Sequence, residues 1–248
     1  MEKELAWGRD KPGDDDMLLS AESDTEAYHG RLARARELTE QAVKSALAAD
    51  SRESAGLWEV NLALQDAEFG NTSEARRLAD AALHLSAGRD VRMFATLAFA
   101  RAGAPERSTA IYKALKKSAG SNTVLTRYWL PSIAAAIELA RGNPAGAVEA
   151  LDSSRPYELG VTYNSLGNLY VVYLRGEAYL RLRDGRSAAI EFEKYKEHSG
   201  TVFNSPLAAL AYLQLARANV MQGDAGAAET NYARFFRSGR KPMQEYSS

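Results

Sequence analysis

The stretch YLRGEAYLRLRDGRSAAIEFEKY, Tyr173 to Tyr195, decides the fold class, because its small and aromatic residues recur at helical spacings. Gly176 and Ala188 lie twelve positions apart, on either side of a turn-forming Asp-Gly pair. Phe192 follows Ala188 by four positions, which places both on one face of a helix. This spacing predicts two helices that cross closely at Gly176 and Ala188.

The same arrangement recurs along the chain. Turns rich in Gly, Asn and Asp are each followed by a small residue that opens a helix, at intervals of 33 to 41 residues: Ala35, Ala75, Ser108, Ala147, Ala188 and Ala228. Another small residue precedes each of these by twelve positions: Ser23, Ala63, Thr96, Ala135, Gly176 and Ala216. Self-similarity at such a period is the mark of a helical repeat array. The pattern therefore predicts about six helix-turn-helix units.

Two other features qualify this all-α prediction. The segment YVVYL, Tyr170 to Leu174, favours a strand by composition, but the repeat spacing places it in a helix. Two connections, at Asp152–Asn168 and His198–Pro206, are longer than the other turns. Long loops in compact arrays are either functional or insertions at a tolerant surface, and both interpretations stay open here.

The units resemble the tetratricopeptide repeat, in which aromatic, Leu, Gly and Tyr positions on a first helix precede Ala, Phe, Ala and Pro positions on a second. The matching residues around the opening stretch are Gly176, Tyr179, Ala188 and Phe192, and those of the last unit are Tyr212, Leu215, Ala216, Ala228 and Tyr232. Val172, Arg175 and Asn219 depart from the motif, and its closing Pro is mostly missing. The resemblance implies a right-handed solenoid over residues 16–236, flanked by a partial upstream repeat or flexible segment at 1–15 and a flexible tail at 237–248.

Longer phrases are similar to the tetratricopeptide-type C-terminal region of bacterial eukaryotic-like serine/threonine kinases. They include DTEAYHGRLARARELTEQAV, AGLWEVNLALQDAEFGN, RYWLPSIAAAIELARGNPAGAVEAL, PYELG and VYLRGEAYL. In such kinases the repeat region follows a catalytic domain and commonly a membrane span, and is taken to dock partners. This chain has no glycine-rich phosphate loop, HRD or DFG motif, so kinase activity is not expected of it.

Composition limits the partners and the compartment. Of the 248 residues 46% are hydrophobic and 25% are charged, as in soluble folded proteins, and the net charge of −1 argues against nucleic acid as a partner. The chain has no cysteine and no apolar run long enough to cross a bilayer, so neither disulfides nor direct membrane insertion is expected. A free chain would stay in the cytoplasm, whereas the matching part of a membrane-anchored kinase could lie outside it.

No catalytic, cofactor or metal motif is present. His29, His84 and His198 lie in three different units without metal-ligand spacing, and no nucleophile elbow, dinucleotide turn or phosphate loop occurs. The acidic run Asp14–Asp16 lacks the spacing of a calcium loop and is interpreted as a helix N-terminal feature. The basic segment Lys113–Lys117 is interpreted as the solvated face of a second helix. We therefore expect no enzyme activity, no cofactor and no metal.

Binding residues are predicted from the resemblance, which implies that first helices line a concave, ligand-binding surface. The positions that would face a ligand are Trp129, Tyr170, Tyr173, Glu177, Arg181 and Arg217. Tyr and Trp offer large contact areas, and Arg forms charge-assisted hydrogen bonds to carboxylates. A peptide or protein segment held by these residues is the predicted ligand. The alternative for Trp129, Tyr170 and Tyr173 is that their rings fill the gaps between packed helices.

The main prediction is a non-catalytic protein-interaction scaffold, and the resemblance implies that it is the sensory or docking region of a kinase-like signalling protein. Two alternatives from other classes stay open. The chain could self-associate through an under-capped end of the array, near RFFRSGRKPMQEYSS. It could instead be an enzyme with a pocket under the 152–168 loop, for which the sequence offers Glu158 alone as a titratable group.

Overall fold

A computed structural model describes residues 15–160 and 167–239 of the chain. The described residues form helices and no strand, which confirms the all-α class. In chain order the elements are α2 (Asp15–Tyr28), α3 (Leu32–Ala48), α4 (Arg52–Glu68), α5 (Thr72–Leu85), α6 (Arg89–Arg101), α7 (Pro105–Ser118), the π-helix η1 (Leu125–Trp129), α8 (Leu130–Ala140), α9 (Pro144–Leu151), the 3-10 helix η2 (Asp152–Tyr157), α10 (Tyr170–Arg181), α11 (Gly185–Glu197), α12 (Ser199–Val202), α13 (Pro206–Gln222) and α14 (Ala225–Ser238). Most of the two predicted terminal segments lies outside the described residues.

One kind of turn joins the helices of six successive pairs: α2 and α3, α4 and α5, α6 and α7, α8 and α9, α10 and α11, and α13 and α14. In every pair an amide after the first helix donates to the carbonyl five residues earlier, at 2.8–3.0 Å, as in Asn71 to Asp66 and Asp224 to Asn219. Such bonds satisfy the last carbonyls of a helix and require a residue with positive φ. Glycine occupies this positive-φ position in five of the six pairs. In the remaining pair, α10 and α11, the position is occupied by Arg183, with φ of 64°.

The second helices begin at residues suited to helix N-termini. The side chains of Asn143, Asp184 and Asp224 accept hydrogen bonds from backbone amides three residues later. Pro105 and Pro144 occupy the first helical turn, where a missing amide proton costs nothing. Gly185, expected in a turn, is instead the first residue of α11, and a Cβ there would lie 2.8 Å from the carbonyl oxygen of Ala218 on α13.

The predicted close crossings are confirmed by burial. All twelve small residues are buried: Ser23, Ala35, Ala63, Ala75, Thr96, Ser108, Ala135, Ala147, Gly176, Ala188, Ala216 and Ala228. Two of the three hydroxyls at these positions bond across the pair, since Ser23 Oγ donates to the carbonyl of Ala35 and Ser108 Oγ to that of Thr96, both at 2.8 Å. The third, Thr96 Oγ1, donates to the carbonyl of Arg92 in its own helix at 2.6 Å. The repeat spacing in the sequence therefore specifies contacts between paired helices.

The two long connections are partly helical. The first contains η2 directly after α9, and its residues 161–166 lie outside the described part. The second contains the single turn α12, so its expected character as a plain loop is wrong. The strand-like segment Tyr170–Leu174 is the start of α10, and Lys113–Lys117 lies on α7, a second helix, as predicted.

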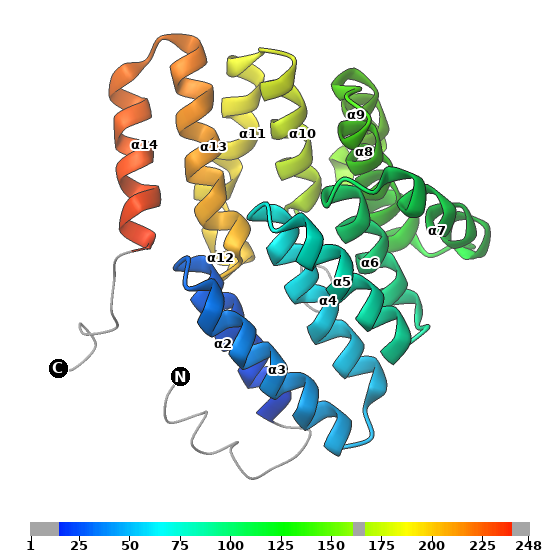
Figure 1. Ribbon diagram of the computed structural model, residues 1–248. Coiled ribbons are helices and arrows are strands. Elements are labelled where there is room, and N and C mark those ends of the chain that lie inside the picture. Colours follow the sequence, from blue (N-terminus) through cyan, green and yellow to red (C-terminus); the bar gives the residue numbers. More distant parts are fainter. Residues whose placement is uncertain (1–14, 161–166, 240–248) are drawn as a thin grey trace, which may run out of the picture.

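The first helices of the pairs form a ring. Successive contacts link α4 to α6, α6 to α8, α8 to α10, α10 to α13, and α13 to α2. The ring is completed where Asn61 and Gln65 of α4 donate to a carboxylate oxygen of Asp24 on α2, at 2.8 and 2.6 Å. Figure 1 shows α13 and α14, in orange and red, returning to the side of α2, in blue. The array thus closes on itself where α13 contacts α2, a contact that the repeat pattern did not predict.

Candidate functional site

The three aromatic residues predicted to bind a ligand are buried. Trp129 is 3% exposed, Tyr170 2% and Tyr173 1%. Trp129 lies edge-on to Phe94, with 4.9 Å between ring centroids, and Tyr173 lies edge-on to Phe192 at 5.7 Å. Their predicted exposure to a ligand is therefore wrong, because closure of the ring turns the inner faces of these helices into core.

Polar groups in this core pair with one another. Tyr170 on α10 donates its phenolic hydrogen to Glu68 on α4. Arg101 on α6 donates to both carboxylate oxygens of Glu68, at 2.6 and 2.7 Å, and lies 2.6 Å from the carboxylate of Glu177 on α10. Burial and the neighbouring Glu68 raise the pKa of Tyr170 well above its usual value, so its hydroxyl stays protonated. The first helices do face inward as predicted, but their own side chains fill the space.

The charged half of the predicted site lies at the surface instead. Glu177, Arg181 and Arg217 line one depression of about 580 Å³, formed by α10, the turn after it, α13 and α14. The other residues lining it are Leu180, Arg183, Gln214, Val220, Met221 and Tyr232. We call it the arginine depression. The structure thus brings together three of the six predicted residues and separates them from the three aromatic ones.

The arginine depression is rich in positive charge. Arg217 donates to the side-chain oxygen of Gln214 at 3.0 Å, and Arg181 donates to the backbone carbonyl of Leu139. Among the described residues none of Arg181, Arg183 and Arg217 forms an ion pair with a carboxylate. Glu177, the one acidic residue in the lining, is paired with Arg101. An anionic group in the depression would therefore meet cations that are not already neutralised.

Arg183 was missed by sequence reasoning, although a signal for it exists. It occupies the positive-φ turn position at which the five other pairs have glycine. A side chain in this conformation costs on the order of 1 kcal/mol relative to glycine. The exception in an otherwise regular turn places a third guanidinium at the arginine depression.

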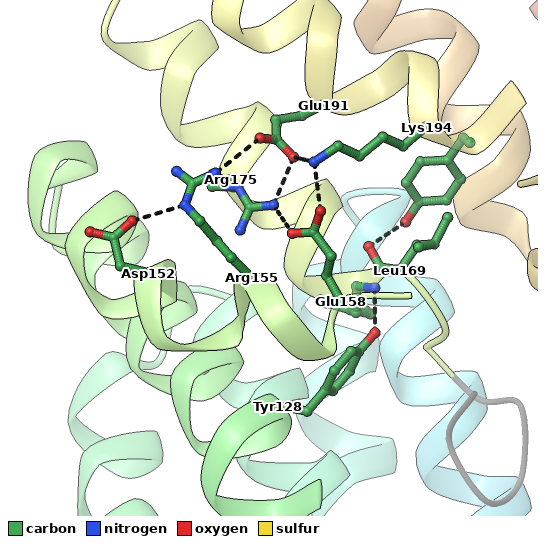
Figure 2. Close-up of polar contacts among 10 residues, drawn as sticks. Tyr128, Asp152, Arg155, Glu158, Leu169, Arg175, Glu191 and Lys194 are labelled. Carbon is green, nitrogen blue, oxygen red and sulfur yellow. Dashed lines mark hydrogen bonds and ion pairs between the residues drawn. The ribbon is translucent and has the colours of Figure 1, made fainter. Parts of the chain in front are cut away.

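A second polar cluster lies beneath the start of the 152–168 loop (Figure 2). Arg175 on α10 is fully buried and donates to Glu158 and, at 2.8 Å, to Glu191 on α11. Lys194 donates to the same two carboxylates, at 2.7 and 3.0 Å. Arg155 contributes an ion pair to Glu191 at 3.9 Å. Glu158 is therefore accompanied by several titratable groups, where the sequence suggested that it stood alone.

Asp152 also belongs to this cluster, since it accepts a hydrogen bond from Arg155 at 3.2 Å, so three cations face three carboxylates and a structural role is favoured. Burial alone would raise the pKa of Glu191, but its hydrogen bonds with Arg175 and Lys194 lower it, so the carboxylate is ionised at neutral pH. Both oxygens of Glu158 are also engaged, one by Arg175 and the other by Lys194. The cluster fastens the segment after η2 to α10 and α11. Arg175 stands where the repeat motif usually has Leu, and this departure was the available sign of the cluster.

The residues considered as metal ligands show other contacts. No group of three or more His, Asp and Glu suited to a metal ion occurs among residues 15–160 and 167–239. Asp15 and Asp16 lie in the first turn of α2, as predicted, and Asp16 accepts a hydrogen bond from the indole of Trp58 at 2.9 Å. Asp14 lies outside the described residues.

Comparisons with known proteins give no family. No family model matches the chain, and no curated protein matches it. In the described part of the chain, every helix is too short or too polar to traverse a lipid bilayer. The evidence for a function therefore comes from the arginine depression itself.

Proposed function

We propose that the chain is a non-catalytic scaffold that binds an acidic segment of a partner protein in the arginine depression. The observation that carries this proposal is the group of three arginines, Arg181, Arg183 and Arg217, without a carboxylate partner among the described residues. Arginine presents several donors in a planar fork and forms strong hydrogen bonds to carboxylates. The presence of Arg183 in a conformation that favours glycine is consistent with a role beyond folding.

The lining also suggests what flanks the acidic group. Leu180, Val220 and Met221 add apolar contact area to the three guanidinium groups, and Val220 is 56% exposed. A ligand with an apolar side chain next to a carboxylate could contact the apolar residues and the guanidinium groups of the depression at the same time. The proposed ligand is therefore a peptide segment in which acidic and bulky apolar residues alternate. The resemblance to repeat regions of bacterial kinases supports a docking role of this kind in signalling.

The test is a peptide array followed by affinity measurement. Immobilised peptides with acidic and apolar residues, and matched peptides with Gln and Asn in place of Glu and Asp, are probed with the intact chain. We expect the acidic set to be retained, and the combined change Arg181→Gln and Arg217→Gln to weaken the best peptide at least tenfold, since charged hydrogen bonds contribute about 2 kcal/mol each. The change Arg76→Gln with Arg127→Gln removes the same charge at exposed positions outside the depression and should leave affinity unchanged.

The change Arg183→Gly separates binding from folding. Glycine suits the positive φ, so the variant should be more stable by about 1 kcal/mol, while its affinity for the peptide falls. Urea unfolding and fluorescence anisotropy measure the two effects. Equal binding of acidic and neutral peptides, or a stable Arg183→Gly variant with undiminished affinity, would contradict the proposal.

The two alternative functions, self-association and an enzyme that uses Glu158, can be distinguished from a peptide-binding scaffold. Self-association is favoured by exposed apolar side chains on late elements, with Ile190 58% exposed and Phe236 59% exposed. A molar mass that rises with concentration in sedimentation would support it. An enzyme using Glu158 would first have to break the bonds that Arg175 and Lys194 make to both its oxygens.

A further inference from the structure

The first and last helix pairs meet at a seam that no sequence pattern predicted. His29, directly after α2, contacts the backbone carbonyl of Ser238 at the end of α14 through its Nδ1 atom. Asn204, just before α13, donates to the hydroxyl of Thr25 on α2 at 3.0 Å. These bonds join residues that are 209 and 179 positions apart in the chain.

A depression of about 240 Å³ lies at this seam. Its lining consists of Tyr28, His29, Tyr212, Arg234, Arg237 and Ser238, and we call it the seam pocket. Three elements contribute to it, since Tyr28 ends α2, Tyr212 lies on α13 and the two arginines lie on α14. The pocket exists only because the array closes.

The seam pocket is lined by hydrogen-bond donors. Arg234 and Arg237 are three residues apart, so they share one face of α14, and neither pairs with a carboxylate among the described residues. The guanidinium of Arg234 lies 5.7 Å from the centre of the Tyr212 ring. Within the same part of the chain, the hydroxyls of Tyr28 and Tyr212 have no hydrogen-bond partner.

The protonation of these groups strengthens the match to an anion. Burial, together with the nearby phenol of Tyr212, raises the pKa of Tyr28 above its usual value, so the Tyr28 hydroxyl carries its proton at neutral pH. The pocket therefore offers two guanidinium groups and two phenolic donors, and its lining within residues 15–160 and 167–239 contains no acidic residue. Position in the last turn of a helix explains a cation at Arg237, but Arg234 lies one turn earlier.

We propose that the seam pocket binds the phosphoryl group of a small phosphomonoester and so links the first helix pair to the last. A phosphoryl group offers three acceptor oxygens and up to two negative charges, which suits two arginines and two hydroxyls better than a carboxylate does. The space also exceeds what a lone phosphate fills, so an ester with a small organic group fits. This site is distinct from the arginine depression and does not depend on the function proposed for it.

The experiment is calorimetric titration of the intact chain at constant ionic strength. The probes are inorganic phosphate, free phosphoserine, a short phosphoserine peptide, sulfate and acetate. We expect phosphoserine to bind more tightly than acetate by at least tenfold, and Arg234→Gln with Arg237→Gln to weaken phosphoserine at least tenfold. Tyr28→Phe should weaken it severalfold while keeping the ring. A free phosphomonoester is the source if phosphoserine binds at least as tightly as the phosphopeptide, and a peptide-borne group is the source if the phosphopeptide binds more tightly.

Two control variants locate the site. Arg76→Gln with Arg186→Gln, at exposed positions elsewhere, and Arg181→Gln with Arg217→Gln, in the arginine depression, should leave phosphoserine affinity within twofold. Circular dichroism shows whether each variant is folded, and hydrogen exchange at residues 28–30 and 236–238 should slow when phosphoserine is bound. The proposal is overturned if no probe binds, if acetate binds as tightly as phosphoserine, or if the Arg181 and Arg217 changes weaken phosphoserine as much as the Arg234 and Arg237 changes.

Discussion

Asp24 shows how a single side chain can hold the ring together and still oppose folding at neutral pH. It accepts hydrogen bonds from Asn61 and Gln65, the bonds that connect α2 to α4. Burial raises the pKa of its carboxyl from 3.8 to about 6, and the two amide hydrogen bonds only partly offset this. The carboxyl is therefore less acidic in the folded chain than in the unfolded chain.

We expect the change Asp24→Asn to stabilise the protein at pH 7.5 but not at pH 4. In the wild-type chain the contribution of this group is fully favourable below pH 3.8 and is lost as the pH rises through about 6, because the folded state must then ionise a partly buried carboxyl group. The amide keeps an acceptor oxygen for Asn61 and Gln65. The expected gain at pH 7.5 is about 2 kcal/mol, measured as the difference in urea unfolding free energy between variant and wild type. A difference that does not change between pH 4 and pH 7.5 would contradict it.

At the scale of single residues, the sequence predicted which helices carry the candidate binding residues, but it did not predict whether their side chains are exposed. Spacing showed that Tyr170 and Tyr173 lie on inner helices, but exposure depends on whether those helices face a groove or one another. That outcome depends on contacts such as Tyr170 with Glu68, which are 102 residues apart, and no local pattern encodes them. Arg181 and Arg217, near the outer ends of their helices, escaped this burial.

Paired helices are the element at which sequence and structure agree most closely. The crossing of α10 and α11 depends on Gly176, because a Cβ there would lie 2.6–2.8 Å from three ring atoms of Phe192. Phe192 is fully buried, so its ring has little freedom to move aside. The small residue therefore sets the distance between these helices.

The change Gly176→Ala should cost about 2 kcal/mol of stability, the usual range for an overpacked core. Combining it with Phe192→Leu should cost less than the sum of the two single changes, since the smaller side chain makes room for the methyl group. Gly200→Ala is the control, because a Cβ at Gly200 meets no atom within 4 Å. Urea unfolding of the wild type, the two single variants and the double variant measures the coupling free energy between Gly176 and Phe192. Strictly additive effects would show that the contact does not limit the crossing.

The helix pairs were predictable because every feature that defines them is local. Turn glycines, capping residues and small residues twelve positions apart all lie within one pair, and each satisfies a constraint of that pair alone. The departures arise from neighbouring elements. Gly185 was expected in a turn but lies against α13, and α12 forms within a connection that the repeat pattern left undefined.

For the whole molecule, closure predicts compact dimensions. A compact chain of 248 residues has a radius of gyration of about 18 Å, whereas an open array of the same helix pairs would be more extended. We expect small-angle X-ray scattering of the intact chain to give a value within a few ångströms of the compact one, with residues outside the described part adding slightly to it. A clearly elongated pair-distance distribution would show that the seam between α2 and α14 is open in solution.

The closed ring was not predictable from the repeat pattern. Each pair shifts the direction of the next by a small rotation, and only the sum of these rotations determines whether the ends meet. The arginine depression could be predicted in part, because the sequence analysis had already named Arg181 and Arg217 as binding residues. The seam pocket was not, because its residues come from the two ends of the array and share no motif.

The seam also sets the order in which the molecule can fold. A linear array can start folding at any unit and grow by adding neighbours, and its terminal units fray first. In this chain the contact between Thr25 and Asn204 can form only after the intervening pairs have adopted their places, so it carries the largest loop-closure cost and comes late. Once formed, it removes the two free ends, and loosening either terminal pair then loosens the other.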